Sequence, residues 1–110
     1  MTAYAVAHLS SVAMGPAIVA YLESIDATLA PFGGRFIIHG GRPEVLEGPW
    51  SGDLIVIAFG DRDSAAAWYR SPAYQAILPL RRDHSVGACF LIDGVDDTHR
   101  ATDILVQAGG

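Results

Sequence analysis

Two polar side chains on one short apolar segment are the strongest candidates for chemistry. Residues 35–39 read RFIIH and are followed by two glycines. If this segment is a strand, Arg35, Ile37 and His39 share one face, and the glycines let a ligand approach the backbone. His39 could act as a general base, because imidazole titrates near neutral pH, and Arg35 could clamp a carboxylate. The structural alternatives are a hydrogen-bonded histidine at a sheet edge and an arginine paired with a carboxylate of the hairpin.

A second group of candidates lies further along the chain. Trp68 and Tyr74 could wall a pocket for an aromatic substrate, although packing in the core is the usual role of aromatic side chains in such a place. Arg81, Arg82 and His84 form a short basic run in an acidic chain. This run could receive an anionic ligand, and a solvated turn explains it equally well. We therefore assign Trp68, Tyr74, Arg81 and His84 as candidate ligand-binding residues.

Sites for metals, nucleotides and nucleic acids are not indicated. The four histidines have no H-x₃-H or H-E-x-x-H spacing, and no glycine-rich loop joins a strand to a helix. The net charge of −5 has no compensating basic run, which argues against nucleic-acid and membrane partners. We expect no cofactor; haem binding through His39 or His84 is the least favoured option. The single cysteine, Cys89, is expected to be a buried thiol, and nothing requires an oxidising compartment, so we expect a cytoplasmic protein.

The elements that must position these residues follow from the apolar pattern. Segments rich in β-branched and aromatic residues predict four strands, at residues 3–9, 35–39, 54–59 and 87–92. Between the first two strands, apolar residues recur at helical spacing, at Ile18, Leu22, Ile25 and Leu29.

The second helical region is expected in two pieces. Asp61 is a good N-cap directly after the third strand, and Ser71 with Pro72 predicts a break and a new start. We expect Pro79 to limit the second piece.

The resulting order, βαββαβ, predicts an α+β ferredoxin-like fold with a four-stranded antiparallel sheet. Both helices must cover the same face, because each crossover is right-handed. The third strand is apolar on both faces, so a second copy should cover the other one, giving a homodimer. We expect this domain at residues 1–95. Residues 96–110 should form a tail with one helical turn around Ile104–Gln107 and frayed terminal glycines.

Three motifs, GGRFIIHGGRPEVLEG, AAAWYRSPAYQAILPLR and FLIDGV, occur in this order along the chain. Together they resemble the domain of unknown function 1330 family, which belongs to the dimeric α/β-barrel superfamily, over roughly residues 3–95. The resemblance implies a dimeric α/β barrel with a pocket beside the sheet in each subunit. Related barrel families include cofactor-free monooxygenases of aromatic polyketides, small isomerases and haem-dependent enzymes, so the fold offers several functions.

These observations predict a protein with a small-molecule pocket. The leading hypothesis is a cofactor-independent enzyme that carries out proton transfer or oxygenation on a small aromatic or carboxylate compound, with His39 and Arg35 as catalytic residues. The alternative is a noncatalytic ligand-binding or stress-related dimer that uses the same pocket.

Overall fold

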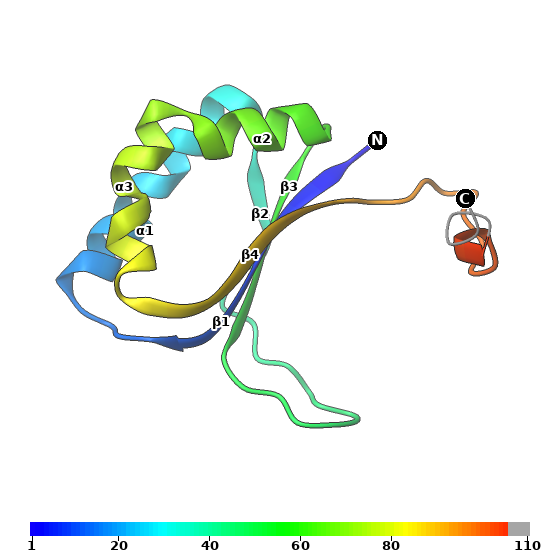
Figure 1. Cartoon of the computed structure of the whole chain (residues 1–110), viewed down its shortest axis with the longest axis horizontal. Helices are drawn as coiled ribbons and strands as arrows, with labels where there is room; N and C mark the ends of the chain where they lie inside the picture. The colour runs from blue at the N-terminus through cyan, green and yellow to red at the C-terminus, as the bar shows by residue number, and fades with distance from the viewer. Residues whose placement is uncertain (106–110) are drawn as a thin grey trace.

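The computed structural model describes residues 1–105 and contains a four-stranded antiparallel sheet covered by helices (Figure 1). The elements are β1 (Ala3–Val12), α1 (Pro16–Leu29), a 3₁₀ turn (Ala30–Phe32), β2 (Arg35–Ile38), β3 (Asp53–Phe59), α2 (Arg62–Arg70), α3 (Pro72–Arg82) and β4 (Ser85–Asp93). The strand order is β2-β3-β1-β4, so each strand–helix–strand crossover skips one position. The predicted ferredoxin-like order is confirmed, and the sheet of the single chain is open at both edges.

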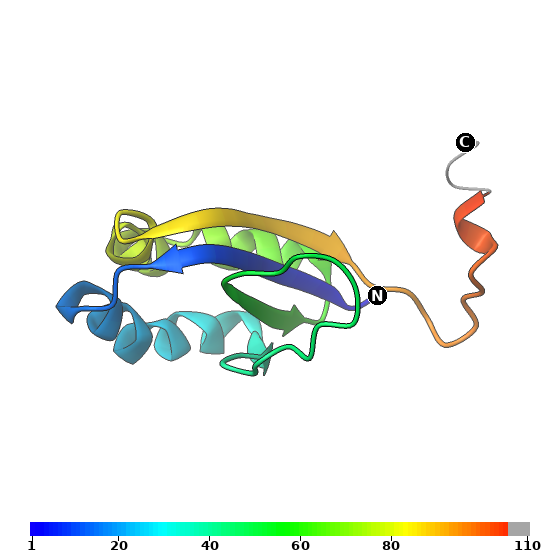
Figure 2. The same cartoon turned by 90° about the horizontal axis from the view of Figure 1, so that it is seen from below.

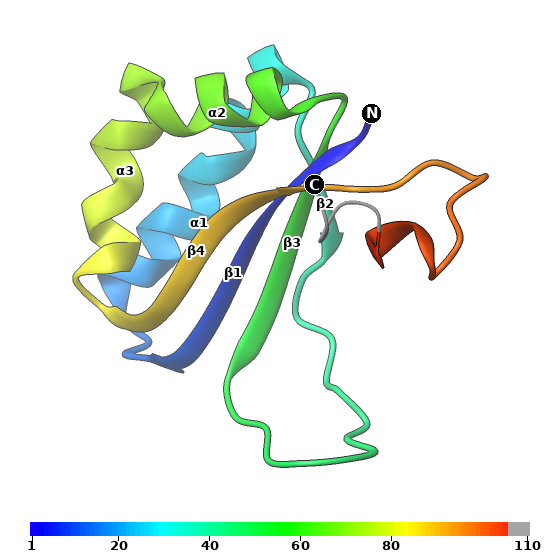
Figure 3. The ribbon, with the colours of Figure 1, turned by 45° about the vertical axis from the view of Figure 1, so that its right-hand side comes forward.

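All three α-helices lie on one side of the sheet, and β1 lies at its centre between β3 and β4 (Figure 3). Ile55, Ile57 and Phe59 alternate toward the helices, and their β1 partners are Ala7, Ala5 and Ala3. On the helix-covered face, β3 therefore carries β-branched and aromatic side chains, whereas the paired positions of β1 carry only the methyl groups of alanine.

Helix α1 packs against the sheet through Ile18, Tyr21, Ile25 and Leu29. Tyr21 takes the place that the spacing predicted for Leu22, whose side chain is 40% exposed. The helix ends in a turn at Gly33, which has a φ of 69°, a left-handed conformation that favours glycine. At Gly34 a Cβ atom would lie 2.7 Å from the Phe59 ring, so only glycine allows this turn to pack on β3.

The predicted break between α2 and α3 is confirmed. The Asp61 side chain accepts a hydrogen bond from the Ser64 backbone N–H at 2.7 Å and caps α2. Ser71 serves both helices, because its hydroxyl donates to the Trp68 carbonyl at 2.7 Å and accepts from the Tyr74 N–H at 3.2 Å.

The expected helix end at Pro79 is wrong, because α3 continues through Pro79 to Arg82. A proline inside a helix removes one N–H donor and crowds the carbonyl four residues before it, but the following residues keep their own donors. The Asp83 N–H, for example, donates to the Pro79 carbonyl at 3.0 Å. Arg81 and Arg82 consequently lie in the last helical turn and not in a solvated turn.

The expected shared face of Arg35 and His39 is also wrong. Arg35 pairs with Ala58 and Phe36 with Ile57, but Ile38 pairs with Val56, so an irregularity falls between Phe36 and Ile38. A bulge of one residue reverses the alternation beyond it. Arg35 therefore lies on the helix-free face, whereas His39 lies on the helix-covered face and stacks on the Phe36 ring at 4.4 Å between centroids.

The helix-free face is apolar and partly exposed. Val6 and Val56 pair at its centre, and Phe90 and Ile92 on β4 are 48% and 49% exposed. Near one end, the long β2–β3 connection covers His8: the Trp50 ring stacks on His8 at 4.7 Å, and His8 Nε2 lies 2.9 Å from the Ser51 carbonyl oxygen.

The segment beyond β4 leads away from the domain (Figure 2). Asp103–Leu105 form part of the expected helical turn, and the rest of that turn and the terminal glycines lie outside the described residues. Within the described range no helix has the length and apolar character needed to cross a membrane.

Candidate functional site

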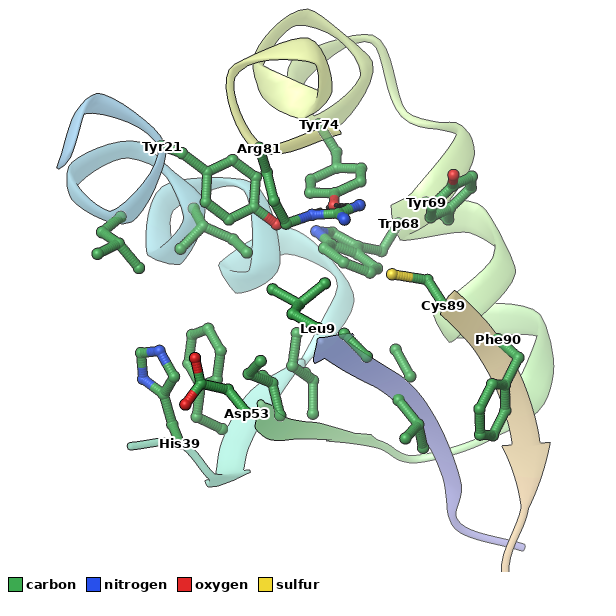
Figure 4. Close-up of a pocket in the computed structure, with 18 of the residues that line it drawn as sticks. Leu9, Tyr21, His39, Asp53, Trp68, Tyr69, Tyr74, Arg81, Cys89 and Phe90 are labelled. Atoms are coloured by element: carbon green, nitrogen blue, oxygen red, sulfur yellow. Dashed lines mark hydrogen bonds between the residues drawn. The ribbon is translucent and has the colours of Figure 1, made fainter. Parts of the chain in front are cut away.

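A cavity of about 450 Å³ lies between the sheet and the helices (Figure 4). This volume lies within the range of ordinary small-molecule pockets, roughly 300–1,000 Å³. Most of its lining is apolar and comes from β1, β3, β4 and the three α-helices. The cavity can therefore enclose a compound of one or two rings.

The space exists because small side chains form the floor. Ala5 and Ala7 on β1 face the helices and line the cavity, and Cys89 on β4 pairs with Ala7 on the same face. Larger side chains at these central positions would fill the gap between the two layers. The expectation that Cys89 is buried is wrong for this chain, because its side chain borders the cavity and is exposed.

A polar cluster from the two long helices stands over this floor. The hydroxyl oxygens of Tyr21 on α1 and Tyr74 on α3 lie 2.9 Å apart and share a hydrogen bond. The guanidinium of Arg81, two turns after Tyr74, makes a long contact of 3.5 Å to the Tyr74 hydroxyl and lies 5.8 Å from the centre of the Tyr21 ring. Figure 4 shows these three polar ends gathered on the helix side of the cavity.

Trp68 and its partners hold Tyr74 in place. The indole ring packs on the Tyr74 ring at 4.1 Å between centroids, and its N–H donates to the Thr28 hydroxyl at 3.0 Å. Both Trp68 and Thr28 are buried, and the hydrogen bonds of Ser71 fix the turn between α2, which carries Trp68, and α3. The Tyr74 hydroxyl is therefore positioned by packing and hydrogen bonds that do not involve a ligand.

The electrostatics of the cluster favour a neutral phenol beside a cation. Burial raises the pKa of Tyr21 well above its usual range, and the neighbouring Tyr74 hydroxyl adds to this effect. Burial lowers the pKa of Arg81, but the neighbouring Tyr74, Cys89 and Tyr21 side chains together raise it above its usual range, so the guanidinium stays charged at any physiological pH.

A second polar group lies at the mouth of the cavity. His39 lies just beyond the end of β2, and Asp53 begins the neighbouring strand β3. Figure 4 shows both on the strand side, with Leu9 between them and the tyrosine–arginine cluster. In the part of the chain that the structure describes, the His39 ring makes no hydrogen bond to another residue, so it is free to meet a ligand.

Four of the six predicted site residues line one cavity: His39, Trp68, Tyr74 and Arg81. Arg35 lies on the opposite face of the sheet. His84 caps the end of α3, with Nδ1 3.0 Å from the Leu80 carbonyl oxygen, and is not among the lining residues.

The sequence reasoning missed Tyr21 and Asp53. Tyr21 could have been found from its place one turn before Ile25 on the apolar face of the first helix, because a tyrosine there brings a hydroxyl into the core. Asp53 carried no local signal, since an aspartate at the start of a strand after a glycine is common in turns. No group of three or more metal-binding side chains occurs within residues 1–105.

Solved structures with the same fold include proteins of unknown function and a cofactor-independent oxygenase. The RPA0582 protein of unknown function from Rhodopseudomonas palustris is 15% identical, with a TM-score of 0.64 over 86% of this chain and 83% of that chain. A dimeric ferredoxin-like protein of unknown function from Jannaschia sp. CCS1 is 14% identical, with a TM-score of 0.55 over 87% of this chain and 100% of that chain.

SnoaB, a cofactor-independent oxygenase from Streptomyces nogalater, is 13% identical, with a TM-score of 0.52 over 90% of this chain and 96% of that chain. At these identities the likeness establishes the fold alone. No curated protein matches the chain. The profile of a family described as "Domain of unknown function (DUF1330)" matches residues 2–95. The chain belongs to this family, the one that its three motifs resemble.

Proposed function

We propose that the protein is a cofactor-independent enzyme that binds a small aromatic or carboxylate compound in the cavity and acts on it by proton transfer or oxygen addition. The observation that carries the proposal is the convergence of the tyrosine–arginine cluster and His39 on one apolar cavity. Apolar pockets with a few convergent polar groups are the usual form of small-molecule sites. The likeness to a cofactor-independent oxygenase supports the same class of chemistry by analogy of fold.

The polar groups suit the first step that both reactions share. Removal of a proton next to a carbonyl group creates an enolate, whose negative oxygen needs hydrogen-bond donors or a cation. Arg81 and the two tyrosine hydroxyls can supply these, and His39 at the mouth can accept the proton. The same enolate is the electron-rich species to which oxygen would add.

Exchange of substrate protons for deuterium tests this proposal. Protein freed of metals with a chelator is incubated in D₂O with aromatic ketones and aromatic acids that carry an enolisable position, and exchange is followed by NMR together with oxygen consumption. We expect accelerated exchange, and a reduction of roughly 10²- to 10⁴-fold in His39→Ala with an unchanged melting temperature. His84→Ala is the matched control, because that histidine lies at the end of α3 outside the cavity lining.

A noncatalytic ligand-binding protein is the second candidate. One observation favours it: within residues 1–105 no carboxylate is hydrogen-bonded to His39, whereas catalytic histidines are usually oriented by such a partner. Binding of ligands without proton exchange or oxygen uptake, in the wild type and in His39→Ala alike, would select this candidate.

We also propose that the protein is a homodimer whose sheets pack through their helix-free faces. The exposed apolar side chains of this face support the proposal, and a dimeric protein is among the solved structures with the same fold. Val56→Asp should give a monomer in size measurements, because it places a charge at the centre of the face. Val19→Asp adds the same charge to a 44% exposed position of α1, on the helix side of the sheet, and should leave the dimer intact. A monomeric wild type at micromolar concentration would contradict the proposal.

A further inference from the structure

Two arginines line the cavity, and Arg81 is the partly buried one, whereas Arg70 is exposed. Within the described residues, the ion pairs of arginine are Arg62 with Asp93 and Arg82 with Asp83, and no acidic side chain lies within 4.0 Å of the Arg81 guanidinium. Arg81 is nevertheless partly buried, in a chain whose net charge is −5. A partly desolvated charge without a counter-ion is unfavourable, and an anion that enters the cavity would relieve this cost.

The tyrosine pair strengthens the case because it has hydrogen-bond donors to spare. Arg81 donates to the Tyr74 oxygen, and one tyrosine hydroxyl donates to the other. Whichever tyrosine donates within the pair, the other keeps its own hydroxyl hydrogen for a ligand. The guanidinium likewise has further N–H groups. The cluster therefore offers donors and one positive charge, which is what a carboxylate oxygen requires.

The other side chains of the cavity indicate the shape and orientation of the rest of the ligand. Ala5, Ala7 and Cys89 form the centre of the floor, and their small side chains leave a space suited to a flat apolar group. Asp53, the one carboxylate of the lining, starts β3 on the strand side, across the cavity from Arg81 in Figure 4. An anionic group is thus attracted to one end of the cavity and repelled from the other.

From this arrangement we infer that the protein binds planar aromatic carboxylates, with the carboxylate held by Arg81 and the Tyr21–Tyr74 pair and the ring lying over the alanines of β1. This inference rests on the proposed function and specifies its ligand class and orientation. It makes Tyr21 and Arg81 specificity-determining residues. Because Tyr21 remains protonated, its hydroxyl can donate at neutral pH.

Calorimetric titration with charged and neutral partners of the same shape tests the inference. Benzoate, phenylacetate and 2-naphthoate are each compared with the corresponding primary amide. The wild type should bind the carboxylates about 10- to 100-fold more tightly than the amides, as expected for a charge-assisted hydrogen bond. Arg81→Gln should remove this difference while binding of the amides changes little.

The chain provides a matched control at the next position. Arg82→Gln removes the same charge from the same helical turn, but Arg82 points away from the cavity and pairs with Asp83, so the preference for carboxylates should persist. If Arg81→Gln fails to fold, the comparison of carboxylate with amide in the wild type decides alone. Equal affinities for the two, or no carboxylate binding at millimolar concentration, would overturn the inference.

This result is separable from that for the proposed function. A preference for carboxylates without proton exchange or oxygen uptake would leave the ligand class standing and reject the enzyme. Proton exchange without a preference for carboxylates would support the enzyme and reject the inferred ligand class.

Discussion

The hydrogen bond between Tyr21 and Tyr74 joins α1 to α3 inside the cavity, and removing either hydroxyl should have a different effect on stability. In Tyr21→Phe the Tyr74 hydroxyl keeps a contact to Arg81, at 3.5 Å. In Tyr74→Phe two contacts are lost at once, because the Tyr21 hydroxyl loses its 2.9 Å hydrogen bond and the Arg81 guanidinium loses its contact to the Tyr74 hydroxyl. We therefore expect Tyr74→Phe to be the more destabilising of the two substitutions.

The expected sizes follow from the burial of the pair. Tyr21 and Tyr74 are 7% and 2% exposed, so each hydroxyl that loses its partner is poorly placed to meet water. A single buried hydrogen bond contributes about 1 kcal/mol, and an unsatisfied buried hydroxyl costs about 1–3 kcal/mol. We expect a loss of about 1 kcal/mol for Tyr21→Phe and about 2 kcal/mol for Tyr74→Phe. The double variant should be more stable than the sum of these losses predicts, by about 1 kcal/mol.

Urea unfolding of the four proteins, followed by circular dichroism, gives these free energies directly. Because about 1 kcal/mol corresponds to roughly 4–8 °C in a domain of this size, thermal melting provides a second readout. Additive losses, or a Tyr21→Phe variant less stable than Tyr74→Phe, would refute the proposed geometry of the cluster.

Two further predictions concern stability. The raised pKa of Tyr21 means that its proton binds more tightly in the folded state than in the unfolded chain. The stability that this proton contributes is therefore fully present below the unfolded tyrosine pKa of about 10 and is lost progressively at higher pH. Tyr21→Phe should flatten the fall of the melting temperature above about pH 10, and an unchanged alkaline profile would contradict this. Ser71→Ala should cost about 1 kcal/mol, because it removes the cap of α3 together with the bond to the Trp68 carbonyl. Ser71→Thr keeps a hydroxyl that can both donate and accept, so it should unfold nearer to the wild-type urea concentration. Equal losses in the two variants would show that the cap contributes little.

The fold was predictable because its signals are local and repeated. Four apolar segments, an apolar helical face and the capping residues Asp61 and Ser71 each indicate the same arrangement, and the structure confirms it. The errors arise where one residue changes the outcome. A single extra residue in β2 moves His39 to the face opposite Arg35, and an alternating pattern does not show where such a bulge falls.

The site was predictable in part because its residues come from distant elements. Trp68, Tyr74 and Arg81 were identified from a short stretch of sequence, and His39 from its strand. Their convergence depends on the packing of α1 and α3, so the role of Tyr21 emerges only in three dimensions. The end of the helix at Pro79 was misjudged because helix-breaking by proline is a tendency that tertiary packing can override.

The central claim is that the cavity between the sheet and the helices is the functional site. Ala7→Leu should fill this cavity, because Ala7 lies at the centre of its floor and faces the helices. Ala76→Leu makes the same substitution at an exposed position of α3. Both variants should remain folded by circular dichroism, since the added side chain enters existing space or solvent.

Calorimetric titration of the wild type and these two variants with the aromatic carboxylates is the most direct measurement. The account predicts that Ala7→Leu reduces their affinity at least about 10-fold, the effect of a loss of roughly 1.4 kcal/mol, whereas Ala76→Leu binds as the wild type does. Equal affinity in the folded Ala7→Leu protein would place the ligand elsewhere and contradict the account.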